Sequence, residues 1–549
     1  MSFWTLENIR HSCGGRWVAG VPTGGGAVVA SGVSIDSRAV GRGQVFFAIA
    51  GERHDGHAFA AQAAGAGAAM LIVERPVDGC ASVAVALVPS TRRALLALAA
   101  AYRARLKATV IAVCGSNGKT TTVRLIDAAL RGGGLRGTAS VKSFNNDVGV
   151  PLTILSAHED DRYLICEVGS NAPGEIGALG AIVKPDVAVV TSIGREHLEG
   201  FKNIESVARE EASILRHLRP GGLAVLTGDA PVLRRFGGDA SRVAWFGASG
   251  PCDWRFSGAA HAMVEVRDSQ AARKAAEQAA GGVAIGLGVR LTFTAHAPLG
   301  AKGWLAGQGG LAGETGAGGG VGGGVDVSLP MPGTHNASNA MAALAVAHEC
   351  GVVLAGAVAG LARAEPPEMR LNVSRVLVPG GGELVVVNDA YNANPESVLA
   401  AINTAQELAK VGAGSGLRLV LVLGDMLELG EAEASSHDEV LSAAVSTGGR
   451  VVVIGPRFAS AVGRWAVGRS AVGLAGAADV EAFPTIDEAA IAKLVGWLAA
   501  LAGGPRAGLS GARGVLVLVK ASRGMRLERV VRAIELAGTA ADSSGSAVR

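Results

Sequence analysis

One loop between an apolar stretch and a helical pattern constrains this chain most. The stretch Thr109–Ile111 is strand-like, and a helical pattern begins at Val123. The loop between them holds two glycines and ends in Lys119 and Thr120. Glycines let backbone N–H groups approach phosphates, and a helix N-terminus favours anions. The pattern predicts a phosphate-binding loop, in which Lys119 contacts the β- and γ-phosphates and the Thr120 hydroxyl binds Mg²⁺.

This loop departs from the common G-x-x-x-x-G-K-[ST] pattern at one position. Val113 occupies the place of the first glycine. A glycine-rich turn with a surface lysine is therefore an alternative, but the strand before and the helix after the loop favour phosphate binding. The residues expected around the phosphates are Gly115, Ser116, Asn117, Gly118, Lys119, Thr120 and Thr121.

Length and composition exclude several classes of protein. A chain of 549 residues predicts three or four domains. A net charge of +3 with 18% charged residues is not the basic footprint of a nucleic-acid-binding protein. The chain is rich in glycine, with 80 residues, but its 49% hydrophobic content predicts packed cores rather than disorder.

Cysteine spacing and hydropathy indicate a soluble cytoplasmic protein. The six cysteines are scattered without a C-x-x-C pair, which is typical of free thiols in a reducing compartment. Residues 1–10 lack the apolar segment of a signal peptide. The apolar stretch Met341–Ala362 is interrupted by His348 and Glu349, so it predicts a pair of buried helices and no membrane span.

Alternating apolar segments divide the chain into three α/β units, residues 1–106, 107–367 and 368–549. The alternation and the nearly continuous apolar strands predict parallel sheets covered by helices on both faces. In the last unit they predict a doubly wound sheet. The predicted strands are 45–49 and 70–73; 109–111, 163–168, 187–191 and 223–226; and 383–387, 417–423, 451–454 and 514–519.

Two further segments carry no predicted chemistry. The Gly/Ala-rich stretch at about 298–324 reads as a flexible surface insertion. The tail from Gly538 to Arg549 is expected to fray.

Polar side chains follow two strands of the middle unit. Glu167 ends a strand beside the predicted phosphate loop, where a second Mg²⁺ ligand belongs, although such carboxylates also cap turns. His197 follows the next strand and can bind a metal or satisfy its own loop. The segment 333–339 opens a helix, where its Ser, Thr and Asn residues can simply be caps.

Three polar loops follow strands of the last unit, at 388–395, 424–430 and 520–524. In open α/β sheets the carboxyl ends of the strands face the ligand. The three loops therefore predict a binding face, with three ordinary loops as the alternative.

Taken together, these motifs resemble the Mur ligase family, ATP-dependent amide-forming ligases of peptidoglycan synthesis. The resemblance spans nearly the whole chain except the Gly-rich insertion and the tail. It is carried by 34–38, 43–51 and 55–57 in the first unit, by 115–121, 145–151, Glu167, His197 and 335–339 in the second, and by 391–395 and 424–430 in the third. The last two segments resemble the members that add D-alanyl-D-alanine.

The resemblance implies an α/β fold of three domains: a UDP-sugar-binding domain, a central P-loop ATPase domain on a parallel sheet, and a C-terminal doubly wound, Rossmann-like domain. It implies ATP and two Mg²⁺ ions, with the substrates UDP-N-acetylmuramoyl-tripeptide and D-alanyl-D-alanine joined through an acyl phosphate. We expect a monomer. The third residue of the peptide, diaminopimelate or lysine, stays open.

The resemblance also assigns site residues. Nucleotide contacts beyond the loop are expected from Asn336, Arg370 and Asp389, and the residue before Arg370 is Met369 where the family usually has glycine. Substrate contacts are expected from Ser37, Arg38, His57, Asn146 and Asn392. Charge complementarity further suggests that Lys520, Ser522 and Arg523 bind the dipeptide carboxylate.

One position departs from the family. Most members carry a lysine, which becomes carbamylated, fourteen residues after the metal-site histidine, and here that position is Glu211. We expect Glu211 to replace the carbamate, so that the metal ligands are Thr120, Glu167, His197 and Glu211 and the catalytic residues are Lys119, His197 and Glu211. The alternative is a solvated helix face, because Arg209 and Glu210 are also charged.

Three competing functions remain from the sequence: a Mur ligase that adds another amino acid, an enzyme like folylpolyglutamate synthase, and a nucleotide-binding regulator without catalysis. The loops 389–395 and 424–430 argue against the first two. Retention of Lys119, Thr120, Glu167 and His197 argues against the third.

Overall fold

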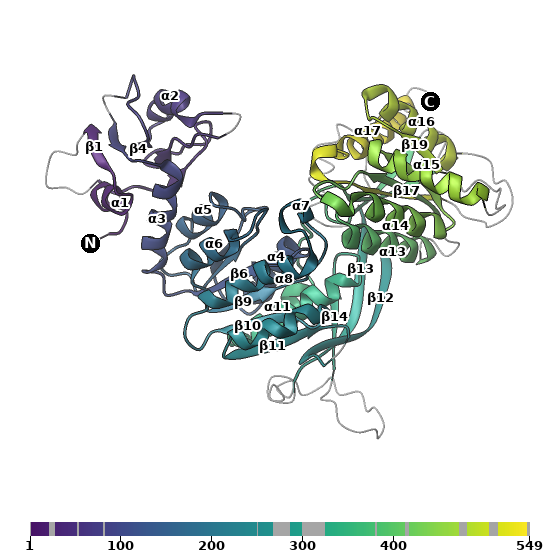
Figure 1. The fold of residues 1–549 in the computed structure, drawn as a ribbon, viewed down its shortest axis with the longest axis horizontal. Helices are drawn as coiled ribbons and strands as arrows, with labels where there is room; N and C mark the ends of the chain where they lie inside the picture. The colour runs from purple at the N-terminus through teal and green to yellow at the C-terminus, as the bar shows by residue number, and fades with distance from the viewer. Residues whose placement is uncertain are drawn as a thin grey trace.

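A computed structural model describes residues 2–20, 28–51, 54–80, 83–249, 251–266, 286–298, 324–378, 382–411, 417–471, 480–503 and 514–545. Within them the chain forms three α/β domains (Figure 1), as predicted. The middle domain joins a first and a third domain that stand apart at the two ends of the molecule. None of the helices in this described part is long and apolar enough to cross a membrane.

The first domain is built on a five-stranded sheet in the order β1-β5-β4-β3-β2. Its strands are parallel except for β1, which pairs antiparallel with β5. The elements are α1 (Leu6–Ser12), β1 (Arg16–Ala19), β2 (Val33–Ser34), β3 (Val45–Phe47), α2 (Ala60–Gly65), β4 (Met70–Val73), β5 (Ala84–Leu87) and α3 (Thr91–Arg103).

The middle domain has a nine-stranded sheet in the order β14-β13-β12-β11-β10-β9-β6-β8-β7. The six strands β6 to β11 are parallel. The four predicted strands β6, β8, β9 and β10 are almost wholly buried, as their continuous apolar runs predict, whereas β7 and β11 are partly buried. The elements are β6 (Thr109–Cys114), α4 (Lys119–Gly132), β7 (Gly137–Ala139), α5 (Gly149–Leu155), β8 (Tyr163–Glu167), α6 (Glu175–Val183), β9 (Val187–Val190), α7 (Leu198–Phe201), α8 (Ile204–Ala212), β10 (Leu223–Thr227), β11 (Arg242–Gly247), β12 (Trp254–Val266), β13 (Gly286–His296), β14 (Val325–Leu329), α11 (His335–Glu349) and α12 (Leu354–Leu361).

Sequence patterns missed the antiparallel arm formed by β12 and β13. This arm extends toward the third domain (Figure 1), where β13 contacts β15 and β12 contacts α13. Val289 of β13 is buried in the hydrophobic core of the third domain. The strands gave no clear signal because β12 mixes small and polar residues, such as Ser257 and His261, without strict alternation.

The third domain is a doubly wound sheet in the order β15-β16-β20-β17-β18-β19, antiparallel only at β15. This confirms the Rossmann-like prediction. The elements are β15 (Asn372–Val378), β16 (Gly382–Asp389), α13 (Pro395–Val411), β17 (Arg418–Gly424), α14 (Glu433–Ser446), β18 (Arg450–Ile454), α15 (Pro456–Ala471), β19 (Val480–Phe483), α16 (Glu488–Gly503), β20 (Val515–Lys520) and α17 (Glu528–Gly545).

Three expectations about flanking segments have different outcomes. The stretch 341–362 belongs to the two helices α11 and α12, as predicted. The expected fraying from Gly538 is wrong as far as Gly545, because α17 continues there after burying Val530 and Ile534 in the core of the third domain. Most of the Gly-rich insertion, 299–323, and residues 546–549 lie outside the described residues.

The helix that follows the phosphate loop is held by a close backbone contact. At Gly360 of α12, an added Cβ atom would lie 2.0 Å from the carbonyl oxygen of Ala128 in α4. At Gly463 of α15, by contrast, no heavy atom lies within 4 Å of that position. Glycine is therefore required for packing at the first site and not at the second.

We predict that Gly360→Ala destabilises the protein by about 2 kcal/mol or more, because backbone atoms cannot give way as a side chain does. Gly463→Ala is the matched control, and it should stabilise the protein by about 0.5–1 kcal/mol through its better helix propensity. Thermal unfolding of both variants checks this prediction. Equal stability of the two variants would contradict the contact.

Candidate active site

A cavity of about 590 Å³ lies where the phosphate loop meets the third domain. Loops after strands of both sheets line it, as expected for the carboxyl ends of parallel strands. Among the predicted site residues, those that line the cavity are Ser116, Asn117, Gly118, Lys119, Thr121, Glu167, His197, Asn336, Arg370, Asp389, Asn392, Lys520 and Arg523.

Two glycines of the phosphate loop are required by its geometry. Gly115 and Gly118 have φ of 122° and 84°, in the region that favours glycine. An added Cβ atom would lie 2.3 Å from the Thr191 hydroxyl at Gly115 and 2.7 Å from Asn339 Oδ1 at Gly118. The loop therefore keeps a narrow backbone turn that leads into α4.

Lys119 points back across this loop into a cluster of carboxylates. Its Nζ donates to the carbonyls of Gly115 at 2.5 Å and Ser116 at 3.2 Å, and lies 3.7 Å from Glu196. Burial would lower the pKa of Lys119, but the charges of Glu196, Glu211 and Glu167 raise it above its usual value. The ammonium group therefore stays charged where phosphates would bind.

Glu196 is a site residue that sequence patterns did not single out. Burial raises its pKa to about 7, against the opposing effect of Lys119. Sequence analysis considered only the neighbouring His197 as a possible metal ligand and gave Glu196, in the same short segment, no role.

Glu167 offers a carboxylate oxygen that fits a divalent cation. Glu167 is buried, and its Oε1 accepts from Asn145 Nδ2 at 3.0 Å, while its buried Oε2 has no hydrogen-bond partner. Burial raises the pKa of Glu167, and Lys119 and then Arg370 oppose this shift. An unpartnered carboxylate oxygen of this kind suits Mg²⁺, which prefers oxygen ligands.

Glu211 faces inward, so the solvated-face alternative is wrong. Its Oε2 accepts from the Gly115 N–H at 2.6 Å, and only 4% of the residue is exposed. The adjacent Glu210 is also buried, and it accepts the N–H groups of Gly174 and Ile176 at the start of α6. The carboxylate of Glu211 thus braces the phosphate loop directly.

His197 is turned toward the third domain. Its Nδ1 lies 2.5 Å from Glu428 Oε2, and its φ is 50°. Across the described residues, no three His, Cys, Asp or Glu side chains are grouped so that they could hold a metal ion together. The predicted ligands Glu167, His197 and Glu211 therefore do not converge in this arrangement.

The segment that opens α11 contacts the phosphate loop rather than merely capping its helix. Thr334 precedes the helix and makes no side-chain cap bond. Asn336 is buried, and its Oδ1 accepts from Asn339 Nδ2 at 2.9 Å, with Asn339 packed against Gly118. The predicted residue Asn336 thus lines the cavity from beneath the loop.

Arg370 reaches the phosphate loop from the junction between the middle and third domains. Its Nη2 donates to the Thr120 hydroxyl at 3.2 Å, and its guanidinium lies 4.3 Å from the centre of the Tyr391 ring. Met369 has φ of 55°, so it adopts the left-handed conformation that glycine favours. Although Met369 replaces the usual glycine, the turn before Arg370 therefore keeps the backbone conformation that glycine favours.

The predicted third-domain residues are paired within their own domain and differ in how far they are exposed. Lys520 is 3% exposed, and its Nζ donates to Asp389 Oδ2 at 2.5 Å and to the Asn392 carbonyl at 3.0 Å. Ser522 is buried and joins two loops, because it accepts the Leu427 N–H and donates to the Ala393 carbonyl. The side chain of Arg523 is 55% exposed, and its Nη1 lies 3.6 Å from Glu528 Oε1, so it is paired but remains accessible from the cavity.

The predicted substrate residues of the first domain lie away from this cavity. Ser37 Oγ donates to Gln62, and Arg38 is paired with Asp36. His57 is buried, with one ring nitrogen bonded to Asp55 and the other accepting the Glu74 N–H. Asn146, in the middle domain, accepts the N–H groups of Val148 and Gly149 at the start of α5 and does not line the cavity either.

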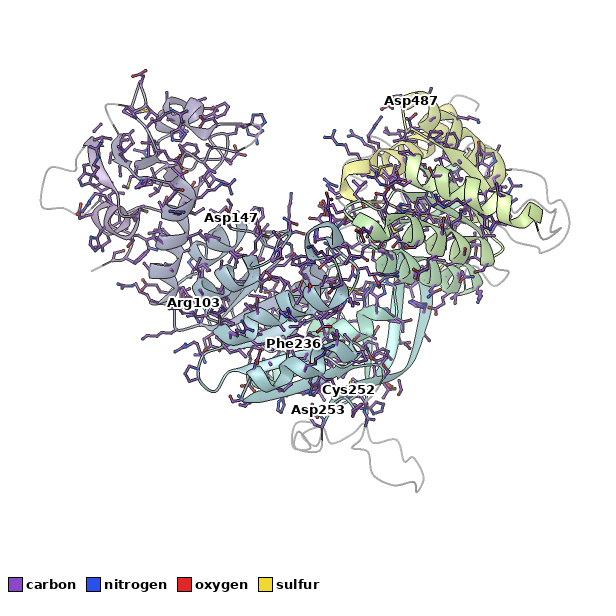
Figure 2. The ribbon with its side chains drawn as sticks, viewed as in Figure 1. Arg103, Asp147, Phe236, Cys252, Asp253 and Asp487 are labelled. Atoms are coloured by element: carbon purple, nitrogen blue, oxygen red, sulfur yellow. The ribbon has the colours of Figure 1, made fainter. Side chains whose placement is uncertain are left out.

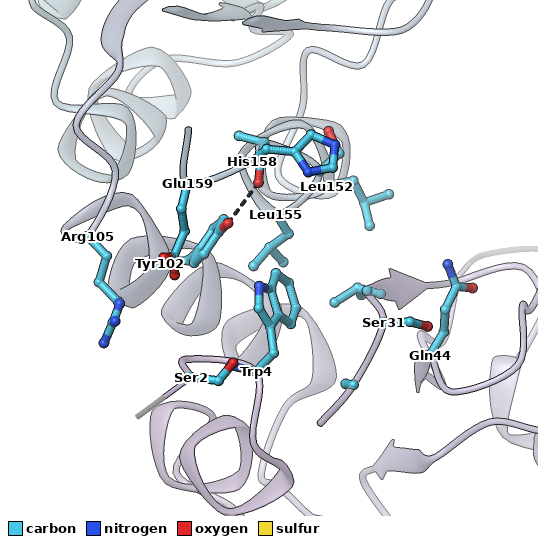
Figure 3. A pocket seen from close by; sticks show the side chains of 15 residues that line it. Ser2, Trp4, Ser31, Gln44, Tyr102, Arg105, Leu152, Leu155, His158 and Glu159 are labelled. Atoms are coloured by element: carbon cyan, nitrogen blue, oxygen red, sulfur yellow. Dashed lines mark hydrogen bonds between the residues drawn. The ribbon is translucent and has the colours of Figure 1, made fainter. Parts of the chain in front are cut away.

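The first and middle domains are joined beside these residues. Arg92 of α3 binds Asp147, which is labelled in Figure 2, at 2.8 and 3.1 Å. A second cavity of about 730 Å³ is lined by residues of both domains, among them Trp4, Tyr102 and Leu155 (Figure 3). None of the predicted site residues lines this second cavity.

Comparison with known proteins identifies the family. Three family models match in chain order: "Mur ligase family, catalytic domain" at residues 29–103, "Mur ligase middle domain" at 113–272 and "Mur ligase, glutamate ligase domain" at 369–501. A curated relative from Bacillus subtilis is 32% identical over 75% of this chain and 77% of its own. The chain belongs to the Mur ligase family.

Two more relatives of this Mur ligase cover almost all of it. A protein of Escherichia coli is 30% identical over 94% of this chain and 96% of its own. Like the Bacillus relative, it is named UDP-N-acetylmuramoyl-tripeptide–D-alanyl-D-alanine ligase. The crystal structure of MurF from Acinetobacter baumannii has a TM-score of 0.72 and 27% identity, covering 97% of this chain and 99% of that one.

One residue that sequence analysis missed holds the loop 424–430 of this Mur ligase. The buried ring of His437 accepts the Met426 N–H at Nε2 and donates to the Glu433 carbonyl from Nδ1. Burial lowers the pKa of His437, against the raising effects of the Glu433 carbonyl and Asp425. The neutral ring is therefore the form that the fold requires.

We predict that acid weakens the third domain through His437. A histidine whose pKa is lowered by folding contributes stability above its ordinary pKa of about 6.5, and this is lost as pH falls toward the lowered value. The midpoint of thermal unfolding should therefore fall between pH 7.5 and 5.5 more in the parent protein than in His437→Gln. An equal fall in both proteins would contradict this role.

Proposed function

We propose that this Mur ligase joins D-alanyl-D-alanine to UDP-N-acetylmuramoyl-tripeptide with ATP, in peptidoglycan precursor synthesis. The observation that carries the proposal is the alignment with relatives of that name over most of the chain. The site supports it, because the phosphate loop lines the same cavity as Lys520 and Arg523 of the third domain.

The first chemical step is the activation of a carboxylate. A carboxylate oxygen of the tripeptide attacks the γ-phosphorus of ATP, the bond to the bridging oxygen of ADP breaks, and an acyl phosphate forms. Both reactants are anions, so charge repulsion is the main obstacle. Lys119 lies at the phosphate loop as a charged ammonium group, and it stabilises the charge that develops during transfer.

The second step forms the amide bond. The free amine of D-alanyl-D-alanine attacks the acyl carbon, the tetrahedral intermediate releases inorganic phosphate, and the amine loses a proton. Arg523 is half-exposed and lines the cavity from the third-domain side, so we assign it the dipeptide carboxylate, for which it would have to release Glu528. Lys520 supports this edge indirectly, since it is paired with Asp389. Enclosing the acyl phosphate between the domains protects it from water.

Divalent cations complete the proposed site. Thr120 and Glu167 would hold one Mg²⁺, for which the unpartnered Oε2 of Glu167 is the structural support. His197 and Glu211 are proposed for a second ion, and both would have to exchange their present partners, Glu428 and Gly115. When bound, the ions neutralise charge on the phosphate oxygens.

We further propose that the enzyme works as a monomer in the cytoplasm. The cavity is formed by two domains of one chain, so a second copy is not needed to complete it. All six cysteines are free, which fits a reducing compartment. Light scattering of the purified protein and cell fractionation test these two points.

A phosphate-release assay tests the function. We expect phosphate to be released only when ATP, UDP-N-acetylmuramoyl-tripeptide and D-alanyl-D-alanine are all present, and not with single amino acids or glutamate as acceptors. Running the assay with diaminopimelate-containing and lysine-containing tripeptides decides the third residue. Phosphate release without either substrate, or only with another acceptor, would contradict the proposal.

Lys119→Ala should lower the rate in this assay by roughly 10²–10³-fold, as loss of one preorganised electrostatic donor does. Lys107→Ala is the matched control, because Lys107 is exposed on the surface just before β6. Near-full turnover of Lys119→Ala would contradict the role of the phosphate loop in the reaction.

A separate prediction concerns Glu211. Because glutamate already carries a carboxylate, turnover should be unchanged when CO₂ and bicarbonate are removed from the buffer. Glu211→Lys should lose most turnover in that buffer and recover part of it when bicarbonate is restored. A marked bicarbonate requirement of the parent enzyme would contradict the role of Glu211.

A further inference from the structure

Arg195 binds the third domain through an arrangement that no motif indicated. It follows β9 in the middle domain, and its Nε donates to Glu396 Oε1 at 2.6 Å. Its Nη1 and Nη2 donate to the two carboxylate oxygens of Glu439 at 2.7 and 3.2 Å. Its backbone N–H donates to Glu396 Oε2 at 3.0 Å. One residue therefore binds two carboxylates of the other domain with four hydrogen bonds.

The two glutamates lie on separate helices of the third domain. Glu396 is in the first turn of α13, where a helix N-terminus favours a carboxylate, and Glu439 is in α14. Because a guanidinium group is planar and its donors are fixed, it binds both carboxylates only in one orientation of the third domain. Arg195 is 29% exposed at its side chain, so solvent screens it only in part.

The same contact sets the position of the phosphate loop against the third domain. Asn394, two residues before Glu396, exchanges side-chain hydrogen bonds with Asn117 of the loop at 3.0 and 3.3 Å. Gly194, next to Arg195, donates its N–H to the Ser116 hydroxyl at 2.9 Å. Figure 1 shows α7, which follows directly, at the side of the middle domain that faces the third.

Arg195 itself does not line the cavity, whereas Glu396 and Asn394 do. It therefore has no direct contact with the space that the substrates would occupy. Its bonds to the two glutamates hold the middle and third domains in the observed arrangement and use no group that the chemistry requires.

We propose that Arg195 is a positioning residue that holds the third domain against the phosphate loop, so that the acceptor and the activated carboxylate meet. This inference rests on the proposed function for its kinetic readout. When the binding-competent arrangement is only partly populated, apparent affinity falls in proportion to that fraction. Loss of the contact therefore raises the KM for the acceptor more than it lowers kcat.

The test is a double-mutant cycle on the full-length enzyme with Arg195→Ala, Glu439→Ala and the double variant. We expect each single variant to raise the KM for D-alanyl-D-alanine about tenfold, with kcat changed less than threefold, and the double variant to be no worse than Arg195→Ala. Arg195→Lys keeps the charge without the planar donors, so it should recover part of the loss.

Arg242→Ala is the matched control. Arg242 also binds a glutamate through two nitrogens, at 2.7 and 2.8 Å to Glu349, but both residues belong to the middle domain. This variant should keep parental kinetics. Solution X-ray scattering without substrates supplies a readout independent of activity: the radius of gyration should increase in Arg195→Ala and Glu439→Ala but not in Arg242→Ala.

Different outcomes separate the two proposals. Absence of acceptor-dependent phosphate release in the parent enzyme would contradict the proposed function. The scattering would still test whether Arg195 holds the third domain in place. Parental kinetics and scattering in Arg195→Ala would overturn the positioning role. So would additive effects in the double variant, or a fall in kcat at unchanged KM together with a lower unfolding temperature.

Discussion

The site depends on a cluster of buried carboxyl groups around one ammonium group. Lys119 is surrounded by Glu196, Glu211 and Glu167, whose charges raise its pKa although burial opposes this. Buried carboxylates are costly unless they are paired, and Glu167 keeps an oxygen without a partner. Buried carboxylates of this kind favour a further cation, such as the Mg²⁺ that we propose to bind with ATP. The electrostatic arrangement thus explains why the cavity is suited to phosphate chemistry.

The fold meets this constraint by placing strand ends from two sheets at one cavity. The phosphate loop follows β6, Glu167 ends β8, and Asp389 and Lys520 end β16 and β20 of the other domain. Arg370 spans the junction and bonds to Thr120. Each domain alone therefore presents only part of the polar groups that line the cavity, and the proposed chemistry requires both domains together.

Two structural connections hold the middle and third domains together. One is the arm of β12 and β13, where buried His261 accepts the Gly333 N–H at Nε2, and its Nδ1 lies 2.9 Å from Glu407 of α13. The other is the contact of Arg195 with Glu396 and Glu439. The arm lies close to the segment that opens α11, whereas Arg195 lies close to the phosphate loop. The third domain is thus fixed at two sides of the cavity.

Local signals made much of this protein predictable from its sequence. The three α/β domains, the buried helix pair within 341–362 and the strand–loop–helix around Lys119 follow from apolar periodicity and from glycine conformation, which involve neighbours along the chain. The same holds for Glu167 at a strand end. The tertiary structure decided the rest: the inward turn of Glu211, the pairing of Lys520 with Asp389, the approach of His197 to Glu428, and the contacts of Arg195. These interactions join residues far apart in sequence, and their geometry depends on how strands, helices and domains are placed, for which periodicity and spacing carry no signal.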